Sequence, residues 1–173
     1  MTQHSAGLMT AGIDGEVALI APDRAALAVG IHRHTTPWQT GPVKWVYVAK
    51  ANGKQRPLGI PVLRDRVQQA RVAKALEPEW EARFEPRSFG FRSGRGCHDA
   101  IEAICRTFKG QRVKRQWIRD ADPPAAFDRI DHGRLLAHLG TFPARGMIAW
   151  WLAAGVVEEA DLPRPSRELR KAG

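Results

Sequence analysis

The chain has 173 residues, the length of one ordinary domain and enough to bury a hydrophobic core. Lys and Arg total 27 against 18 Asp and Glu, and the resulting net charge of +9 favours a polyanionic partner, although a basic but non-specific surface has the same composition. Two cysteines cannot build a disulfide framework and fit a cytoplasmic setting. The longest apolar run, residues 147–157, is too short to span a bilayer, and no secretory leader is expected, so membrane insertion is not expected.

The first predicted features are a flexible start and a short helix. Residues 1–12 are small and polar without periodicity, and Gly12-Ile13-Asp14-Gly15 is a turn sequence, so residues 1–16 are predicted to form a flexible N-terminus that ends in a turn. A helix is predicted from Asp23 onward, with Asp23 as its N-cap.

A basic β-hairpin is predicted next. Residues 43–50 alternate between two faces, as a half-buried strand does, and Asn52-Gly53 is a tight-turn sequence from which the chain returns to Ile60. The tip carries Lys50, Lys54 and Arg56. These cations could clamp phosphates, because guanidinium binds phosphate oxygens two at a time. A solvated edge protected by lysines explains the same spacing equally well.

Two helices with a loop between them follow the hairpin. Residues 64–84 have helical periodicity, with a break or kink predicted near Glu77 because of Pro78. Residues 88–96 interleave phenylalanines, glycines and arginines, a composition that suits base stacking, although a Phe pair can also simply anchor a loop. The next helix is predicted to start at His98 and Asp99 as caps and to bury an apolar stripe. The stripe consists of Ala100, Ile101, Ile104, Cys105 and Phe108.

Residues 117–132 form an acidic stretch in an otherwise basic chain. Trp117 and Ile118 are predicted to end a strand that Pro123-Pro124 prevents from continuing, and Asp131 is predicted to cap the following helix. Carboxylates at a strand-to-helix turn are typical ligands of hard cations. The helix is predicted to bury Leu135, Leu136 and Leu139.

The C-terminal part is predicted to contain one more helix and a strand. The helix covers residues 144–154 and ends at Gly155, and Val156 and Val157 begin the strand. Trp150 and Trp151 are interpreted as packing residues. Residues 161–173 are charged and patternless and are predicted to be an irregular tail.

Taken in order, these stretches resemble the reverse transcriptase and maturase proteins encoded by bacterial group II introns. The matching segments are residues 12–15, 48–61, 65–66, 76–78, 88–92, 94–95, 98–100 and 121–132. The resemblance implies an α+β fold, with the fingers and partial palm of a right-hand polymerase. Its helices would pack on the hairpin and on an incomplete antiparallel palm sheet. The implied fingers-like region is residues 17–116, and the implied partial palm is residues 117–160.

The resemblance also implies roles for individual residues. Asp122 matches the family's first metal-binding catalytic aspartate, with the carbonyl of Pro123 as an assisting ligand for Mg²⁺ in a two-metal mechanism. Phe127 matches the residue that selects deoxynucleotides, and Lys50 and Arg56 match residues that bind the incoming dNTP. RNA-binding residues are implied at Lys44, Lys54, Phe89, Phe91, Arg92 and Arg95. The implied partners are an RNA template or intron RNA, a DNA primer and dNTP.

One departure from the family pattern limits the expected activity. The family's Gly-Thr-Pro-Gln-Gly-Gly segment and Tyr-Ala-Asp-Asp hairpin do not occur in this sequence. A single carboxylate cannot hold two magnesium ions at useful affinity, so weak or absent Mg²⁺ binding and no polymerisation by this chain alone are expected. Three hypotheses remain open: a truncated polymerase, a non-catalytic RNA-binding module derived from the fingers, and a decayed gene product that folds poorly.

Overall fold

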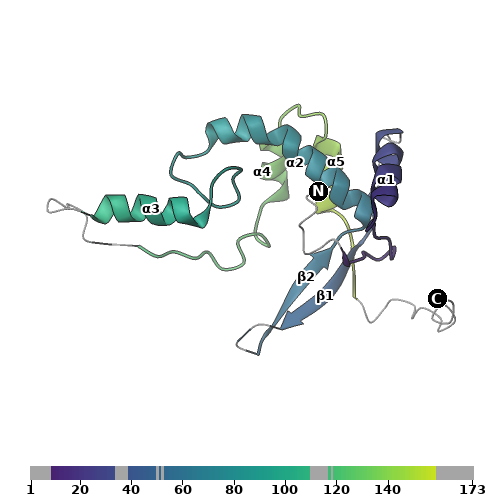
Figure 1. Cartoon of the computed structure of the whole chain (residues 1–173), viewed down its shortest axis with the longest axis horizontal. Helices are drawn as coiled ribbons and strands as arrows, with labels where there is room; N and C mark the ends of the chain where they lie inside the picture. The colour runs from purple at the N-terminus through teal and green to yellow at the C-terminus, as the bar shows by residue number, and fades with distance from the viewer. Residues whose placement is uncertain are drawn as a thin grey trace. The chain divides into compact units, whose positions relative to one another are not determined.

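The computed structural model describes residues 9–33, 39–49, 51, 53–109, 117 and 119–158. Within them lie helices α1 (Ala21–Arg33), α2 (Leu63–Arg83), α3 (Cys97–Phe108), α4 (His132–His138) and α5 (Arg145–Leu152), and strands β1 (Val43–Ala49), β2 (Gln55–Ile60) and β3 (Val156–Glu158) (Figure 1). This composition agrees with the predicted α+β class. The chain divides into unit 1, Met1–Val72 with Asp131–Gly173, and unit 2, Ala73–Ile130, and each is described by itself. The predicted boundaries at residues 16, 116 and 160 stay a prediction.

The sheet belongs to unit 1 and has the strand order β2-β1-β3. Strands β1 and β2 form the predicted antiparallel hairpin, with Lys44 opposite Ile60 and Ala49 opposite Gln55 (Figure 1). Gly53 has the positive φ of 76° that the turn requires. The predicted hairpin is therefore confirmed.

The third strand corrects the expected sheet type. Strand β3 confirms the strand predicted at Val156 and Val157, but it pairs with β1 in parallel, with Val43 opposite Val156. The expectation of an antiparallel sheet was therefore wrong for these strands. The physical reason is connectivity, because a long crossover through several helices can return the chain in either direction, whereas a short turn cannot.

The two first helices differ in detail from their predictions. Helix α1 begins at Ala21, so Asp23 lies inside its first turn and is not its N-cap. Pro22 fits there because the first-turn N–H groups have no partner within the helix. Helix α2 continues through Pro78, so the break that was one of the two predicted alternatives does not occur, and the kink stays a prediction. The helical bond from the Phe84 N–H to the Trp80 carbonyl, 3.0 Å long, shows that the helix resumes its pattern after the proline.

Helix α3 in unit 2 confirms the predicted helix but not its predicted core. None of the side chains of α3 is buried, and Ile101 and Ile104 are 55% and 56% exposed. Apolar periodicity identifies one face of a helix but not what covers that face. Of the two predicted caps, Asp99 does cap the start of the helix, because it accepts a 2.6 Å hydrogen bond from the Gly96 N–H. No capping contact supports the predicted role of His98.

The last two helices belong to unit 1. Asp131 caps α4 as predicted and accepts a 2.9 Å hydrogen bond from the Arg134 N–H, and the three predicted leucines are half-buried. Helix α5 ends at Leu152 with Ala153 as its C-cap, so the prediction that Gly155 ends it was wrong. The Gly155 carbonyl instead accepts a 2.8 Å hydrogen bond from the Val43 N–H, which places Gly155 at the start of the β1–β3 pairing.

One carboxylate joins three segments of unit 1. Asp65, in the first turn of α2, is 1% exposed and accepts hydrogen bonds from the Thr40 hydroxyl and the Gly41 N–H, both at 2.9 Å. It also accepts a 3.1 Å bond from the Trp151 indole on α5. Asp65 thus fixes the chain before β1 and helix α5 to the start of α2. Trp151, predicted to be a packing residue, is half-buried, whereas Trp150, predicted to pack as well, is 46% exposed.

The predicted turn at residues 12–15 packs against the end of the hairpin. The Gly15 N–H donates a 3.3 Å bond to the Gly12 carbonyl, which closes the turn. A Cβ on Gly12 would lie 2.7 Å from Cα of Val62, so only glycine allows this close approach.

Candidate nucleic-acid interface

The hairpin in unit 1 carries the predicted basic residues on one face and near the turn. Directly opposed residues of an antiparallel pair share a face, so Arg56, which pairs with Val48, projects on the same side as Lys44. Arg56 and Lys54 are exposed, and Lys44 is half-buried. Lys50 lies outside the described residues. The structure therefore brings Arg56 and Val48 together at the outer end of the hairpin, and Lys54 lies two residues before Arg56 in the chain.

The other face of the hairpin has a different chemistry. Trp45 and Tyr47 pack edge to face with ring centroids 6.4 Å apart, and the Tyr47 hydroxyl donates a 3.3 Å hydrogen bond to Glu158. The charge of Glu158 raises the pKa of Tyr47, and burial and the hydrogen bond add to the effect. A carboxylate on this face disfavours phosphate, so the face with Lys44 and Arg56 is the candidate for a polyanion.

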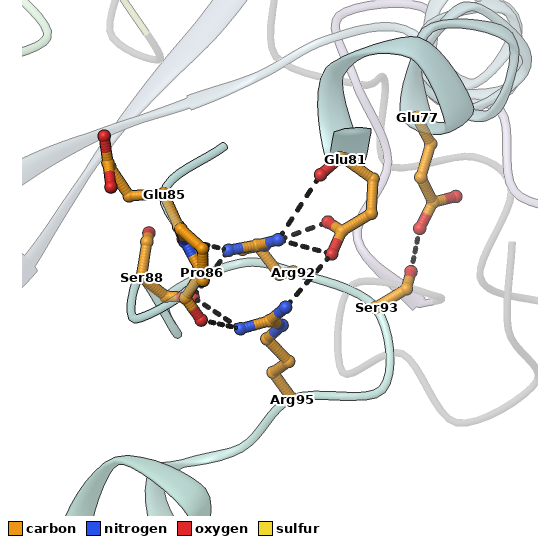
Figure 2. A network of polar contacts seen from close by, with 8 residues as sticks. All are labelled: Glu77, Glu81, Glu85, Pro86, Ser88, Arg92, Ser93 and Arg95. Carbon is orange, nitrogen blue, oxygen red and sulfur yellow. Dashed lines mark hydrogen bonds and ion pairs between the residues drawn. The ribbon is translucent and has the colours of Figure 1, made fainter. Parts of the chain in front are cut away.

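In unit 2, the loop between α2 and α3 is organised around Arg92 (Figure 2). The Arg92 Nε and Nη2 atoms contact the Glu81 carboxylate at 2.9 and 2.5 Å. Its Nη1 atom donates to the Glu85 and Ser88 carbonyls at 2.6 and 2.9 Å. Only 4% of the Arg92 side chain is exposed, which favours a role inside the protein. Its predicted contact with RNA stays an untested prediction.

Arg95 makes further contacts within the same loop and with α2. Its Nη1 atom donates to the Pro86 carbonyl at 2.5 Å, and its Nη2 atom lies 3.6 Å from the Glu81 carboxylate. Its guanidinium lies over the ring of Phe89, 5.9 Å from the centroid. At the other side of the loop, the Ser93 hydroxyl donates to Glu77 (Figure 2). Two glutamates of α2 thus hold the loop in place.

Acid should weaken this network. The hydrogen bond from Arg92 lowers the pKa of Glu81, opposed by burial and aided by the charges of Arg92 and Arg95. A group with a lowered pKa in the folded state stabilises the fold above its unfolded pKa, and that stabilisation is lost as the pH falls through the folded value. We expect the difference in melting temperature between the wild type and Glu81→Gln to stay constant from pH 7 to 5 and to shrink below about pH 4. A difference that persists unchanged at pH 3 would contradict the ionic role of Glu81.

Phe91 has an uncommon conformation and exposure. Its φ is +57°, in the left-handed region that bulky residues rarely adopt. The side chain is also fully exposed, at 107% of the reference area. Phe89, by contrast, is half-buried. The loop therefore projects one of its two predicted RNA-binding phenylalanines into solvent and packs the other.

The loop and α3 also border an open groove of about 570 Å³. Its lining includes Arg87, Phe89, Glu102, Arg106 and Thr107. Glu102 and Arg106 form an ion pair at 2.6 Å, which neutralises much of the charge on that side. Asp99 also lines the groove, so its two carboxylates balance its two arginines, and the groove has no net positive charge that would favour a phosphate.

Residues 119–130 of the acidic stretch belong to unit 2 and are exposed. Asp122 and Pro123 lie on the surface just before a turn, and Phe127, within that turn, is 80% exposed. Ala125 has a positive φ of 52°. Trp117 is not in a strand and is 91% exposed, so the strand prediction is not supported there, and Ile118 lies outside the described residues.

The described residues do not fit a two-magnesium site. Across residues 9–158, gaps excepted, no group of three or more His, Cys, Asp or Glu side chains is arranged to hold a metal ion. Two magnesium ions held close together need bridging carboxylates, and the predicted ligands supply one carboxylate, of Asp122, and the carbonyl of Pro123.

Sequence reasoning missed two acidic residues that organise the structure, Asp65 and Glu81. The partners of Asp65 lie 24, 25 and 86 residues away, and Arg92 lies 11 residues after Glu81. Such pairings leave no periodic signal in a single sequence. Among the described helices, none is long and apolar enough to cross a membrane.

Comparison with known proteins identifies the family. Residues 48–168 match the family described as reverse transcriptase (RNA-dependent DNA polymerase). Protein YkfC of Escherichia coli is 38% identical over 145 residues, which cover 79% of this chain and 37% of YkfC. Group II intron-encoded protein LtrA of Lactococcus lactis is 44% identical over 96 residues, which cover 55% of this chain and 15% of LtrA. Nuclear intron maturase 1, mitochondrial, of Arabidopsis thaliana is 37% identical over 71 residues, 41% of this chain and 9% of the maturase.

The chain therefore belongs to the reverse transcriptase family and, within it, to the group II intron reverse transcriptases and maturases. The resemblance predicted from the sequence motifs is confirmed. The chain spans well under two thirds of the length of these relatives, so their whole-protein activities do not pass to it directly.

Proposed function

We propose that this chain carries the fingers of a group II intron reverse transcriptase and binds single-stranded RNA through the cationic face of its hairpin. The observation that carries the proposal is the position of Arg56, exposed at the outer end of the hairpin on the face opposite Glu158. The guanidinium fork matches phosphate oxygens, and Lys44 and Lys54 add positive charge near it. The formal net charge of +9 supports the same partner.

Within this proposal, the family's catalytic roles fall on five residues. Asp122, with the Pro123 carbonyl, is the metal ligand that this chain contributes, and Phe127 is the residue that selects the deoxyribose. Lys50 and Arg56 bind the triphosphate of dNTP. The exposure of Asp122 and Phe127 supports access by a nucleotide. Polymerisation then requires carboxylates beyond the described residues, and RNA binding does not.

Primer extension tests the catalytic side of the proposal. We expect the chain, with Mg²⁺, dNTP and a DNA primer on an RNA template, to give no extended product, because one carboxylate cannot hold two magnesium ions close together. The matched control is Asp122→Ala, which should be indistinguishable from the wild type. An extended product that Asp122→Ala abolishes would show that this chain assembles a working metal site.

Direct binding tests the RNA side of the proposal. The anisotropy of a fluorescein-labelled single-stranded RNA of about 20 nucleotides should rise on titration with the chain at 50 mM salt. Competition with unlabelled duplex DNA and duplex RNA then measures the preference for single strands. No rise in anisotropy at micromolar protein would refute the proposed function.

A further inference from the structure

We propose that Glu81 is a positioning residue for nucleic-acid binding: through Arg92 it fixes the loop of residues 84–96 so that Phe91 stacks on an unpaired base. The inference rests on the proposed RNA binding and deepens it. It assigns a function to a helix residue that makes no contact with the ligand, and it names the chemistry of the site, a single-stranded segment whose bases are unstacked.

The first step is that the Glu81–Arg92 pair determines the path of the loop. A guanidinium binds a carboxylate with two parallel bonds in one plane, and both Nε and Nη2 of Arg92 contact Glu81. The remaining nitrogen reaches the carbonyls of Glu85 and Ser88 (Figure 2). One buried side chain therefore ties two loop carbonyls to α2, and its orientation depends on the Glu81 carboxylate.

The second step is that this tie holds the adjacent Phe91 outward. Phe91 precedes Arg92 directly, so a fixed Arg92 limits where the Phe91 backbone can go. A bulky residue at positive φ is strained and persists only where its surroundings determine the backbone. Full exposure of the same aromatic ring removes any packing reason for that strain. The combination is explained if the ring is held ready for a ligand.

The third step concerns the ligand. An exposed aromatic ring stacks on the face of a base that is free on at least one side, which single-stranded RNA provides and a paired duplex does not. The exposed Arg87, on the same loop, supplies positive charge for the backbone of the strand. Phe89, under Arg95, is half-buried and is less suited to this contact.

The decisive comparison is between two glutamates of the same helix. Glu79 forms an exposed ion pair with Arg83 at 2.5 Å, whereas Glu81 holds Arg92. Glu79→Gln and Glu81→Gln change the net charge equally, so electrostatics alone predicts equal, slightly tighter RNA binding for both. The positioning role predicts that Glu81→Gln alone weakens binding, about five- to tenfold if one stacked base is lost. The probe is a single-stranded RNA containing 2-aminopurine, whose fluorescence is quenched on stacking and should be quenched less by Glu81→Gln.

Phe91→Leu separates positioning from a general loss of folding. This exposed residue can change without disturbing a core, and its substitution should weaken binding and quenching as much as Glu81→Gln does. The double variant should be no weaker than either single variant, because both remove the same contact. Additive losses would instead show that Glu81 acts through the fold, and unchanged binding by Phe91→Leu would refute the stacking contact. Both results overturn the inference.

Trypsin tests the Glu81 contact without any RNA. Cleavage after Arg87, Arg92 and Arg95 should be faster in Glu81→Gln than in Glu79→Gln and the wild type, because the loop is released. Equal cleavage rates would overturn the inference even if RNA binding is normal. If the wild type binds no RNA, both the proposed function and the stacking role are refuted. If only the Phe91 or the trypsin experiment contradicts the expected result, the inference is refuted but RNA binding by the hairpin is not.

Discussion

Replacing Asp65 with alanine is expected to lower the free energy of unfolding by about 3 kcal/mol or more. The variant leaves the Gly41 N–H, the Thr40 hydroxyl and the Trp151 indole without their shared acceptor, in a place where the carboxylate is 1% exposed. An unsatisfied buried donor costs about 1–3 kcal/mol, and the deleted side chain also leaves a cavity. Urea denaturation followed by tryptophan fluorescence measures the change.

Two further variants make the Asp65 experiment specific. Asp23→Ala removes an exposed carboxylate from the first turn of α1 and should change the free energy of unfolding by at most about 1 kcal/mol. Asp65→Asn retains one acceptor oxygen but presents an amide N–H to donors, so its loss should be intermediate. Equal stability of Asp65→Ala and Asp23→Ala would contradict the view that Asp65 joins the segments of unit 1.

Neutralising the outer end of the hairpin should produce the largest loss of RNA affinity. Each phosphate contact with a single strand is worth about fivefold in affinity between 1 M and 0.1 M salt, so Lys54→Ala/Arg56→Ala should bind roughly twentyfold more weakly at 0.1 M. The substituted residues are exposed, so the fold should not change. Fluorescence anisotropy of a labelled single-stranded RNA measures the loss.

The matched control for the hairpin variant is a cation in the same unit. Arg134 on α4 has a side chain that is 86% exposed, and its Nε atom lies 4.0 Å from the carboxylate of Asp131. Arg134→Ala should weaken binding no more than a general loss of one charge does, about twofold. The double variant removes two charges and Arg134→Ala removes one. If Arg134→Ala lost half as much binding free energy as the double variant, binding would depend on net charge and not on the hairpin.

How far the sequence predicts this molecule depends on the range of the interactions. The hairpin follows from residues that are neighbours in the chain, since alternation over residues 43–50 and the Asn52-Gly53 turn specify it locally. The Asp131 cap follows from a three-residue spacing. The family motifs are also local, which is why the resemblance was confirmed.

Interactions between distant residues escaped prediction. The apolar stripe of α3 predicted a core, but the exposed Ile101 and Ile104 show that periodicity does not identify a partner surface. The parallel pairing of β3 depends on a crossover rather than on its own residues. Arg92 was assigned to RNA from its place in a motif, and only the structure shows that Glu81 occupies its guanidinium.

The dependence of RNA affinity on salt tests the central claim most directly. For the wild type, the logarithm of the association constant should fall linearly with the logarithm of salt concentration, and Lys54→Ala/Arg56→Ala should make that slope shallower by about 1.4. Arg134→Ala should leave the wild-type slope nearly unchanged. A wild-type affinity independent of salt, or a slope that the hairpin variant does not alter, would contradict RNA binding by the cationic face of the hairpin.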